Sequence, residues 1–198
     1  MLEKNKFFIK TFILVGLLLG LYIFLPSDAH ASVNESSLVF DDDIEATAYY
    51  DAGDAPNLDI KTSEYTFMFW VNVTEGPVSG DYDTFYGKWA TSTNDMEYKL
   101  EYKNWLGNHS IFYCSSDDGS TEHCTYWSQE LTEGNWYHVA VTQAPRATDK
   151  VSLWINGDSQ GARTGHATNY YPASTTNFYI GSQNDEDQYF DGKIDEFK

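Results

Sequence analysis

The chain has 198 residues, of which 12 are Lys or Arg and 30 are Asp or Glu, so its formal net charge at pH 7 is -18. Its aromatic share of 17% and hydrophobic share of 41% are too high for an intrinsically disordered chain, and its length suits one folded domain. Because so acidic a chain repels phosphate groups and anionic lipid headgroups, its composition argues against nucleic-acid binding and against membrane docking through basic residues.

Residues 1–31 have the organisation of a secretory signal peptide. Lysines precede an apolar run from Thr11 to Leu25, and Ala29-His30-Ala31 provides the small residues of a cleavage site. The alternative is a retained anchor, because residues 7–25 are nearly as long as the roughly 20 residues that cross a bilayer. In both cases the positive-inside rule places the rest of the chain outside the cell. We therefore expect a secreted protein or one on the extracellular face of the cell membrane, with any membrane attachment confined to residues 7–25.

The next region alternates between apolar and polar residues in a way that predicts strands. In residues 65–73 apolar side chains recur at every second position, which is typical of a strand with one buried face. Residues 97–103 repeat the pattern, and Tyr98, Leu100 and Tyr102 are predicted to point inward. The charged residues between them are predicted to face solvent, as in an antiparallel sheet with one wet side. These are Glu97, Lys99, Glu101 and Lys103.

Further strands are predicted at 136–143, 151–157, 178–181 and 190–197. The second of these closes on Asn156-Gly157, a dipeptide suited to the positive φ angles of a tight hairpin turn. No segment after the leader shows a sustained 3.6-residue period, and turn-forming residues interrupt the apolar runs at short intervals. The predicted fold class is therefore an all-β sandwich, formed as one domain over residues 38–198.

Cys114 and Cys124 lie ten positions apart on either side of a turn-rich segment. In the oxidising compartment that the leader implies, two such cysteines can pair across a hairpin, and we expect one disulfide. A zinc site is disfavoured, because neither a second cysteine pair nor a histidine at a zinc-ligand spacing accompanies them.

Several motifs in a fixed order carry a resemblance to a known family. They are FMFWVNV, GKW followed by EYKLEY, NWYHVAVT, VSLWINGDSQ, and FYIGSQ with YFDGKIDEF. In this order and spacing they resemble a laminin G-like domain of the concanavalin A-like lectin/glucanase superfamily, over nearly all of residues 38–198. The resemblance implies a jelly roll of two antiparallel sheets, one of them concave, that recognises glycans or other proteins outside the cell.

The sequence offers no catalytic constellation. The superfamily that this chain resembles includes retaining glucanases, which carry E-x-D-x-E on one strand. That spacing places two carboxyls about 5 Å apart, and this chain has no such string. Neighbouring acidic residues of a strand point to opposite faces and cannot act together. No G-x-S-x-G is present, and His109, His123, His138 and His166 lie in no recognisable catalytic setting. We expect no enzymatic activity from this domain.

Calcium is the cofactor that the sequence suggests. Hard cations take oxygen ligands, which the acidic clusters offer. The resemblance implies a cation at one rim, where the matching residues are Asp41 and Asp43 in the opening strand and Asp195 in the closing strand, two strands expected to lie side by side. The alternative is that the acidic run is a solvated strand end and that Asp195 hydrogen-bonds a loop.

Exposed aromatic side chains are the candidates for stacking on sugar rings. Six are predicted to lie on strand faces away from the core or in loops: Trp70, Tyr82, Trp105, Trp154, Tyr170 and Tyr171. The predicted function is a non-catalytic carbohydrate-binding, lectin-like module whose partner is an extracellular glycan, with a structural calcium. The alternatives are an adhesion module that binds a surface protein, and an accessory domain of a larger secreted glycoside hydrolase.

Overall fold

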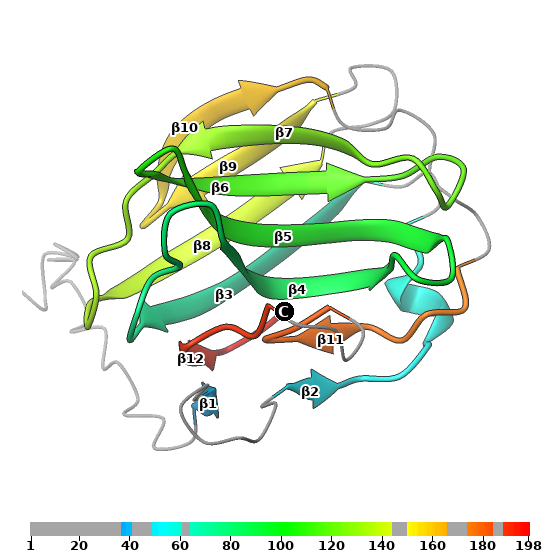
Figure 1. Ribbon diagram of the computed structural model, residues 1–198, viewed down its shortest axis with the longest axis horizontal. Coiled ribbons are helices and arrows are strands. Elements are labelled where there is room, and N and C mark those ends of the chain that lie inside the picture. Colours follow the sequence, from blue (N-terminus) through cyan, green and yellow to red (C-terminus); the bar gives the residue numbers. More distant parts are fainter. Residues whose placement is uncertain (1–36, 41–48, 61–63, 144–149, 166–173, 184–187) are drawn as a thin grey trace, which may run out of the picture. The chain divides into compact units, whose positions relative to one another are not determined.

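The computed structural model describes residues 37–40, 49–60, 64–143, 150–165, 174–183 and 188–198. Within these ranges the chain forms two six-stranded antiparallel sheets that lie face to face, and one short 3-10 helix at Pro56–Leu58 (Figure 1). The all-β, jelly-roll-like sandwich predicted from the sequence is confirmed. Among the described residues no helix is long and apolar enough to cross a membrane. Residues 1–31, the predicted signal peptide or anchor, lie outside the described ranges.

The first sheet contains both the first and the last strand of the chain. In spatial order its strands are β1 (Leu38–Phe40), β12 (Gly192–Asp195), β3 (Tyr65–Val73), β8 (Trp136–Gln143), β9 (Val151–Ile155) and β10 (Asp158–Arg163). The second sheet, in front in Figure 1, is built mainly from one meander of long strands. Its order is β2 (Tyr50–Asp51), β11 (Tyr179–Ile180), β4 (Tyr82–Ala90), β5 (Asp95–Trp105), β6 (Asn108–Ser115) and β7 (His123–Ser128).

The core lies between the two sheets and is rich in aromatic rings. Phe67 of β3 packs against Tyr86 and Tyr98 of the second sheet, with ring centroids 5.0 and 5.4 Å apart. The residues predicted to point inward from 65–73 and 97–103 do so, because a side chain at every second position of a strand faces the same side. The predicted hairpin after β9 is also present, with φ angles of 52° at Asn156 and 84° at Gly157.

A buried lysine fastens the segment after β2 to the second sheet. The Nζ atom of Lys88, on β4, lies 2.8 Å from Asp54, 2.5 Å from Asp59 and 3.7 Å from Glu97. The other carboxylate oxygen of Glu97 accepts a hydrogen bond from the amide of Ile60 at 2.6 Å. Burial alone would lower the pKa of Lys88, but hydrogen bonds to Asp54 and Asp59 raise it above its ordinary value. Three carboxylates share one ammonium, and burial raises the pKa of Glu97 to about 7.

This raised pKa makes the stability of the fold depend on pH. The pKa of Glu97 rises from 4.5 to about 7 on folding, so its stabilising contribution is complete below pH 4.5 and is lost as the pH rises through about 7. The free energy of unfolding, measured with urea across that interval, should therefore fall less steeply in Glu97→Gln, which cannot ionise, than in the wild type. Parallel curves for the two proteins would contradict the assignment.

Candidate ligand-binding face

The outer face of the second sheet, the side turned away from the core, carries the candidate site. Cross-strand register sets its side chains in rows: Lys103 lies between Tyr82 and Ser110, and Glu101 lies between Thr84 and Phe112. The side chains that build the site are Tyr82, Trp89, Lys99, Glu101, Lys103, Trp105, Phe112 and Tyr126.

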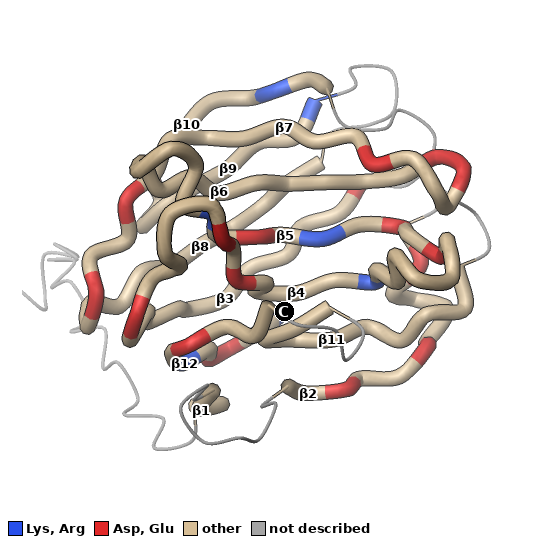
Figure 2. Tube along the Cα trace, viewed as in Figure 1, with Lys and Arg blue, Asp and Glu red and all other residues tan. Residues whose placement is uncertain are grey.

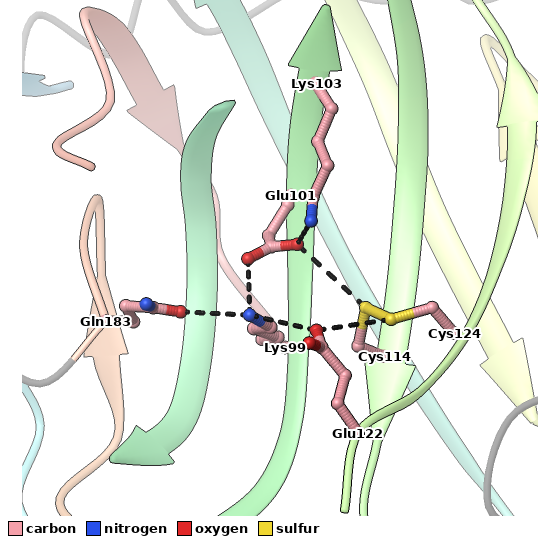
Figure 3. Close-up of a disulfide and its surroundings, with 7 residues drawn as sticks. All are labelled: Lys99, Glu101, Lys103, Cys114, Glu122, Cys124 and Gln183. Carbon is pink, nitrogen blue, oxygen red and sulfur yellow. Dashed lines mark hydrogen bonds and ion pairs between the residues drawn. A yellow bond between two sulfur atoms is a disulfide. The ribbon is translucent and has the colours of Figure 1, made fainter. Parts of the chain in front are cut away.

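Glu101 is the centre of this face. It is fully buried, with one carboxylate oxygen 2.6 Å from Nζ of Lys99 and the other 2.7 Å from Nζ of Lys103 (Figure 3). Nζ of Lys99 also lies 3.2 Å from Glu122 and 3.3 Å from the side-chain oxygen of Gln183. Each buried charge therefore contacts an opposite charge, which offsets the cost of removing it from water.

Aromatic rings cover the two lysines. Nζ of Lys99 lies 4.6 Å from the ring centroid of Trp89, and Nζ of Lys103 lies 4.4 Å from that of Tyr82 and 5.0 Å from that of Phe112. Cations at this range over a ring face are attracted by its quadrupole. Burial, followed by the nearby carboxylates of Glu101 and Glu122, raises the pKa of Tyr82 well above its ordinary value of 10.0, so its hydroxyl stays protonated even at alkaline pH and can donate a hydrogen bond.

These contacts correct the prediction that the charged residues of β5 face solvent. Lys99 and Glu101 do point away from the core, but both are buried, and Glu97 is buried in the cluster around Lys88. Among the four, Lys103 keeps part of its side chain exposed, 18%. Alternation along one strand shows which side is outer, but it does not show whether neighbouring strands and loops cover that side.

The predicted disulfide between Cys114 and Cys124 is present on the same face (Figure 3). It joins β6 to β7, where the two cysteines are direct cross-strand partners. Sγ of Cys124 lies 3.2 Å from a carboxylate oxygen of Glu122, and Sγ of Cys114 lies 3.9 Å from one of Glu101. Because each sulfur is bonded to the other, neither is a thiolate that could take a metal ion here.

Trp105, Phe112 and Tyr126 form a row of rings across β5, β6 and β7, which we call the aromatic row. The ring centroids are 6.2 Å apart for Trp105 and Phe112, and 5.0 Å apart for Phe112 and Tyr126, whose planes differ by 17°. Trp105 is 61% exposed and Tyr126 is 56% exposed. Flat, exposed rings that hold one another in place provide a surface on which a sugar ring can stack.

The predicted ligand-binding residues fall into three groups. Tyr82 and Trp105 lie on this face, although on strand ends and not in the loops expected from the sequence, since Tyr82 begins β4 and Trp105 ends β5. Trp70 and Trp154 lie on the outer face of the first sheet. Tyr170 and Tyr171 lie outside the described residues.

The sequence reasoning missed Phe112 and Tyr126. A signal for them was available in the disulfide: if Cys114 and Cys124 are cross-strand partners, antiparallel register places Phe112 opposite Tyr126 on the same side of the sheet.

The predicted metal ligands are only partly within the described residues. β1 and β12 are side by side as expected, but Asp41 and Asp43 lie outside the described ranges. Asp195 is opposite Trp70 of β3, and one of its carboxylate oxygens accepts a hydrogen bond from the amide of Glu196 at 2.7 Å. Within the described ranges no group of three or more carboxylates or histidines has the spacing of a metal-ion site.

Residues 45–198 match the laminin G-like family model of the concanavalin A-like lectin/glucanases superfamily. The chain therefore belongs to that superfamily, as the motifs in the sequence predicted. A search of curated protein sequences gave no match.

Solved structures with a similar fold include glycan-binding and laminin domains. The CBM40 of the Ruminococcus gnavus IT-sialidase, bound to α2,3-sialyllactose, has a TM-score of 0.62 and 13% identity, covering 82% of this chain and 87% of that one. A protein of Bacteroides ovatus provisionally described as carbohydrate-binding has a TM-score of 0.57 and 20% identity, over 75% of this chain and 40% of that one. Domains LG4-5 of the mouse laminin α1 chain have a TM-score of 0.54 and 13% identity, over 81% of this chain and 40% of theirs.

These likenesses show the fold that the chain shares with its neighbours. The chain spans less than half the length of the B. ovatus and laminin structures.

The buried ion pairs of Glu101 predict a large effect of its neutralisation. In Glu101→Gln the buried Lys99 and the partly buried Lys103 both lose their contact with this buried carboxylate, and we expect the free energy of unfolding to fall by about 3 kcal/mol. The matched control is Glu196→Gln, since the contact of Glu196 with Lys198 is 3.8 Å long and exposed. That change should cost less than about 1 kcal/mol. Equal losses in urea denaturation of the two variants would contradict the central position of Glu101.

Proposed function

We propose that this protein is an extracellular carbohydrate-binding module that holds a glycan on the outer face of its second sheet without cleaving it. The observation that carries the proposal is the aromatic row next to Lys103, whose side chain is partly exposed and whose ammonium contacts the rings of Tyr82 and Phe112. Ring faces for stacking beside a few fixed polar donors are the recurring composition of sugar-binding sites. The disulfide and the signal-peptide pattern of residues 1–31 support an extracellular location.

The charge arrangement favours binding without catalysis. A glycosidase needs two carboxyl groups that flank the bond to be cleaved. Glu101 is fully buried with both of its carboxylate oxygens against lysines, so it is not available to a substrate. The absence of the E-x-D-x-E string from the sequence points the same way.

Glycan binding should depend on the aromatic row. We expect Trp105→Ala to weaken binding about tenfold, the loss that corresponds to about 1.4 kcal/mol of stacking. The control is Trp154→Ala, which removes a tryptophan that is 37% exposed on the outer face of the other sheet, and which should bind as the wild type does. The measurement is a glycan array followed by titration of the purified protein, with melting temperatures to verify folding. Equal affinities of the two variants would contradict binding at the outer face of the second sheet. If the folded protein binds no glycan on the array, glycan binding itself is contradicted.

A protein-binding adhesion module is the second candidate, and the outer face of the first sheet favours it. Trp70, Trp136 and Trp154 are between 37 and 42% exposed there, and the ring of Trp70 contacts that of His138 with centroids 5.3 Å apart. Exposed apolar surface of this kind is typical of a face that another protein covers. Under this candidate, Trp154→Ala would weaken attachment to a surface protein and Trp105→Ala would not.

We also propose a structural calcium with Asp195 as a ligand. The pairing of β1 with β12 supports it, whereas completion of the ligand set depends on Asp41 and Asp43. If the ion binds, calcium should raise the melting temperature of the wild type, because a ligand that binds only the native state stabilises it. Asp195→Ala should abolish that rise, and an undiminished rise in the variant would remove Asp195 from the site.

A further inference from the structure

A pocket opens where the edge strands of the two sheets meet. β7 is the last strand of the second sheet and β10 the last of the first, and Figure 1 shows them running next to each other. The indole Nε1–H of Trp127, on β7, donates a hydrogen bond to the carbonyl of Gly161, on β10, at 2.9 Å. Beside this link is a hollow of about 610 Å³, which we call the edge pocket. Its lining includes Tyr126, Lys150, Arg163 and Thr164.

Two cations line the edge pocket side by side. Arg163 pairs with Val151 in the β9–β10 ladder, so it lies next to Lys150, and Figure 2 shows two basic positions together at this edge. Lys150 and Arg163 are both exposed. The chain has only 12 basic residues, and Lys88, Lys99 and Lys103 are already held by carboxylates. Lys150 and Arg163, by contrast, have no carboxylate within 4 Å among the residues that the structure describes.

The negative charge of the whole chain does not prevent anion binding at such a point. At physiological ionic strength charges beyond about 8 Å are largely screened, so an anion in the pocket responds mainly to its immediate neighbours. Glu122, two residues before Cys124 in the pocket wall, is held by Lys99 at 3.2 Å. The planar fork of Arg163 matches the geometry of a carboxylate or a sulfate, and Lys150 adds a second positive charge.

The edge pocket is continuous with the aromatic row. Tyr126 belongs to both, since it lines the pocket and its ring stacks on that of Phe112 with centroids 5.0 Å apart. A sugar chain stacked along the row would therefore bring a substituent at its end to Lys150 and Arg163. We infer that the edge pocket binds the carboxylate or sulfate group of an acidic glycan whose rings lie on the aromatic row. This inference rests on the proposed function and specifies its ligand class.

The test compares glycans that differ only in charge. Suitable pairs are sialyllactose with lactose, trigalacturonate with its methyl ester, and sulfated with unsulfated N-acetyllactosamine. We expect the wild-type protein to bind the acidic member of at least one pair about tenfold or more tightly than the neutral member, and the identity of that pair distinguishes a carboxylate from a sulfate. The preference should weaken as salt is added, because it is electrostatic.

Variants connect that preference to the pocket. Arg163→Gln combined with Lys150→Met should abolish the acidic preference and leave affinity for the neutral member unchanged. Lys193→Met is the matched control, because Lys193 is an exposed lysine on β12 of the first sheet, and it should keep the preference. Melting temperatures of all variants verify that they fold.

The failure of this inference can be told apart from that of the proposed function. Equal binding of both members of every pair by the wild type, or an acidic preference that survives in the double variant, would overturn the edge-pocket assignment. If in either case Trp105→Ala weakens binding, the proposed function stands while the assignment falls. If the folded protein binds none of the glycans, both the edge-pocket assignment and the proposed carbohydrate-binding function are overturned.

Discussion

The carboxylate of Glu101, held between the ammonium groups of Lys99 and Lys103 in the middle of β5, is the interaction on which the outer face depends. Lysines fixed in this way present their cations to the rings of Trp89, Tyr82 and Phe112. Phe112 in turn supports Trp105 and Tyr126, the exposed members of the aromatic row. The proposed binding surface is thereby preorganised by ion pairs that are largely buried, with Lys103 alone of the three residues partly exposed, which reduces the entropy lost when a ligand binds.

Basic residues are few in this chain, and several of them are held in ion pairs. The chain has 12 basic residues against 30 acidic ones, and three of the basic residues, Lys88, Lys99 and Lys103, pair with carboxylates of the segment after β2 or of the second sheet. An exposed pair of cations in such a chain is therefore unusual, which is why Lys150 and Arg163 are notable at the edge pocket. The excess of acid elsewhere favours solubility and leaves the edge pocket as a local exception.

The sequence predicted the strands and the disulfide, because both depend on local information. Side-chain alternation has a period of two and is visible in 65–73 without knowledge of any neighbour. The cysteines are separated by a single hairpin, so their pairing requires no long-range knowledge. The superfamily could also be inferred, because its motifs occur in order along the chain.

What the sequence could not predict depends on which strands become neighbours. The burial of Lys99 and Glu101 requires Trp89, Gln183 and the disulfide, which come from three other parts of the chain. The edge pocket requires β7 to meet β10, a contact between two sheets that no pattern within either strand indicates. The expected exposure of single aromatic residues did not locate one binding face, because exposure does not show which sheet a strand joins. Trp70 and Trp154 are on the first sheet, whereas Tyr82 and Trp105 are on the second.

The chain contains six tryptophans, and their indole N–H signals can report on which face of the sandwich a glycan binds. The experiment is to titrate the isotopically labelled protein with a glycan that it binds and to follow each indole signal by NMR. We expect the signal of Trp105 to shift while those of Trp70, Trp136 and Trp154 stay in place, because the proposed glycan site is on the outer face of the second sheet. Shifts confined to Trp70, Trp136 and Trp154 would place the glycan on the first sheet and contradict binding to the second.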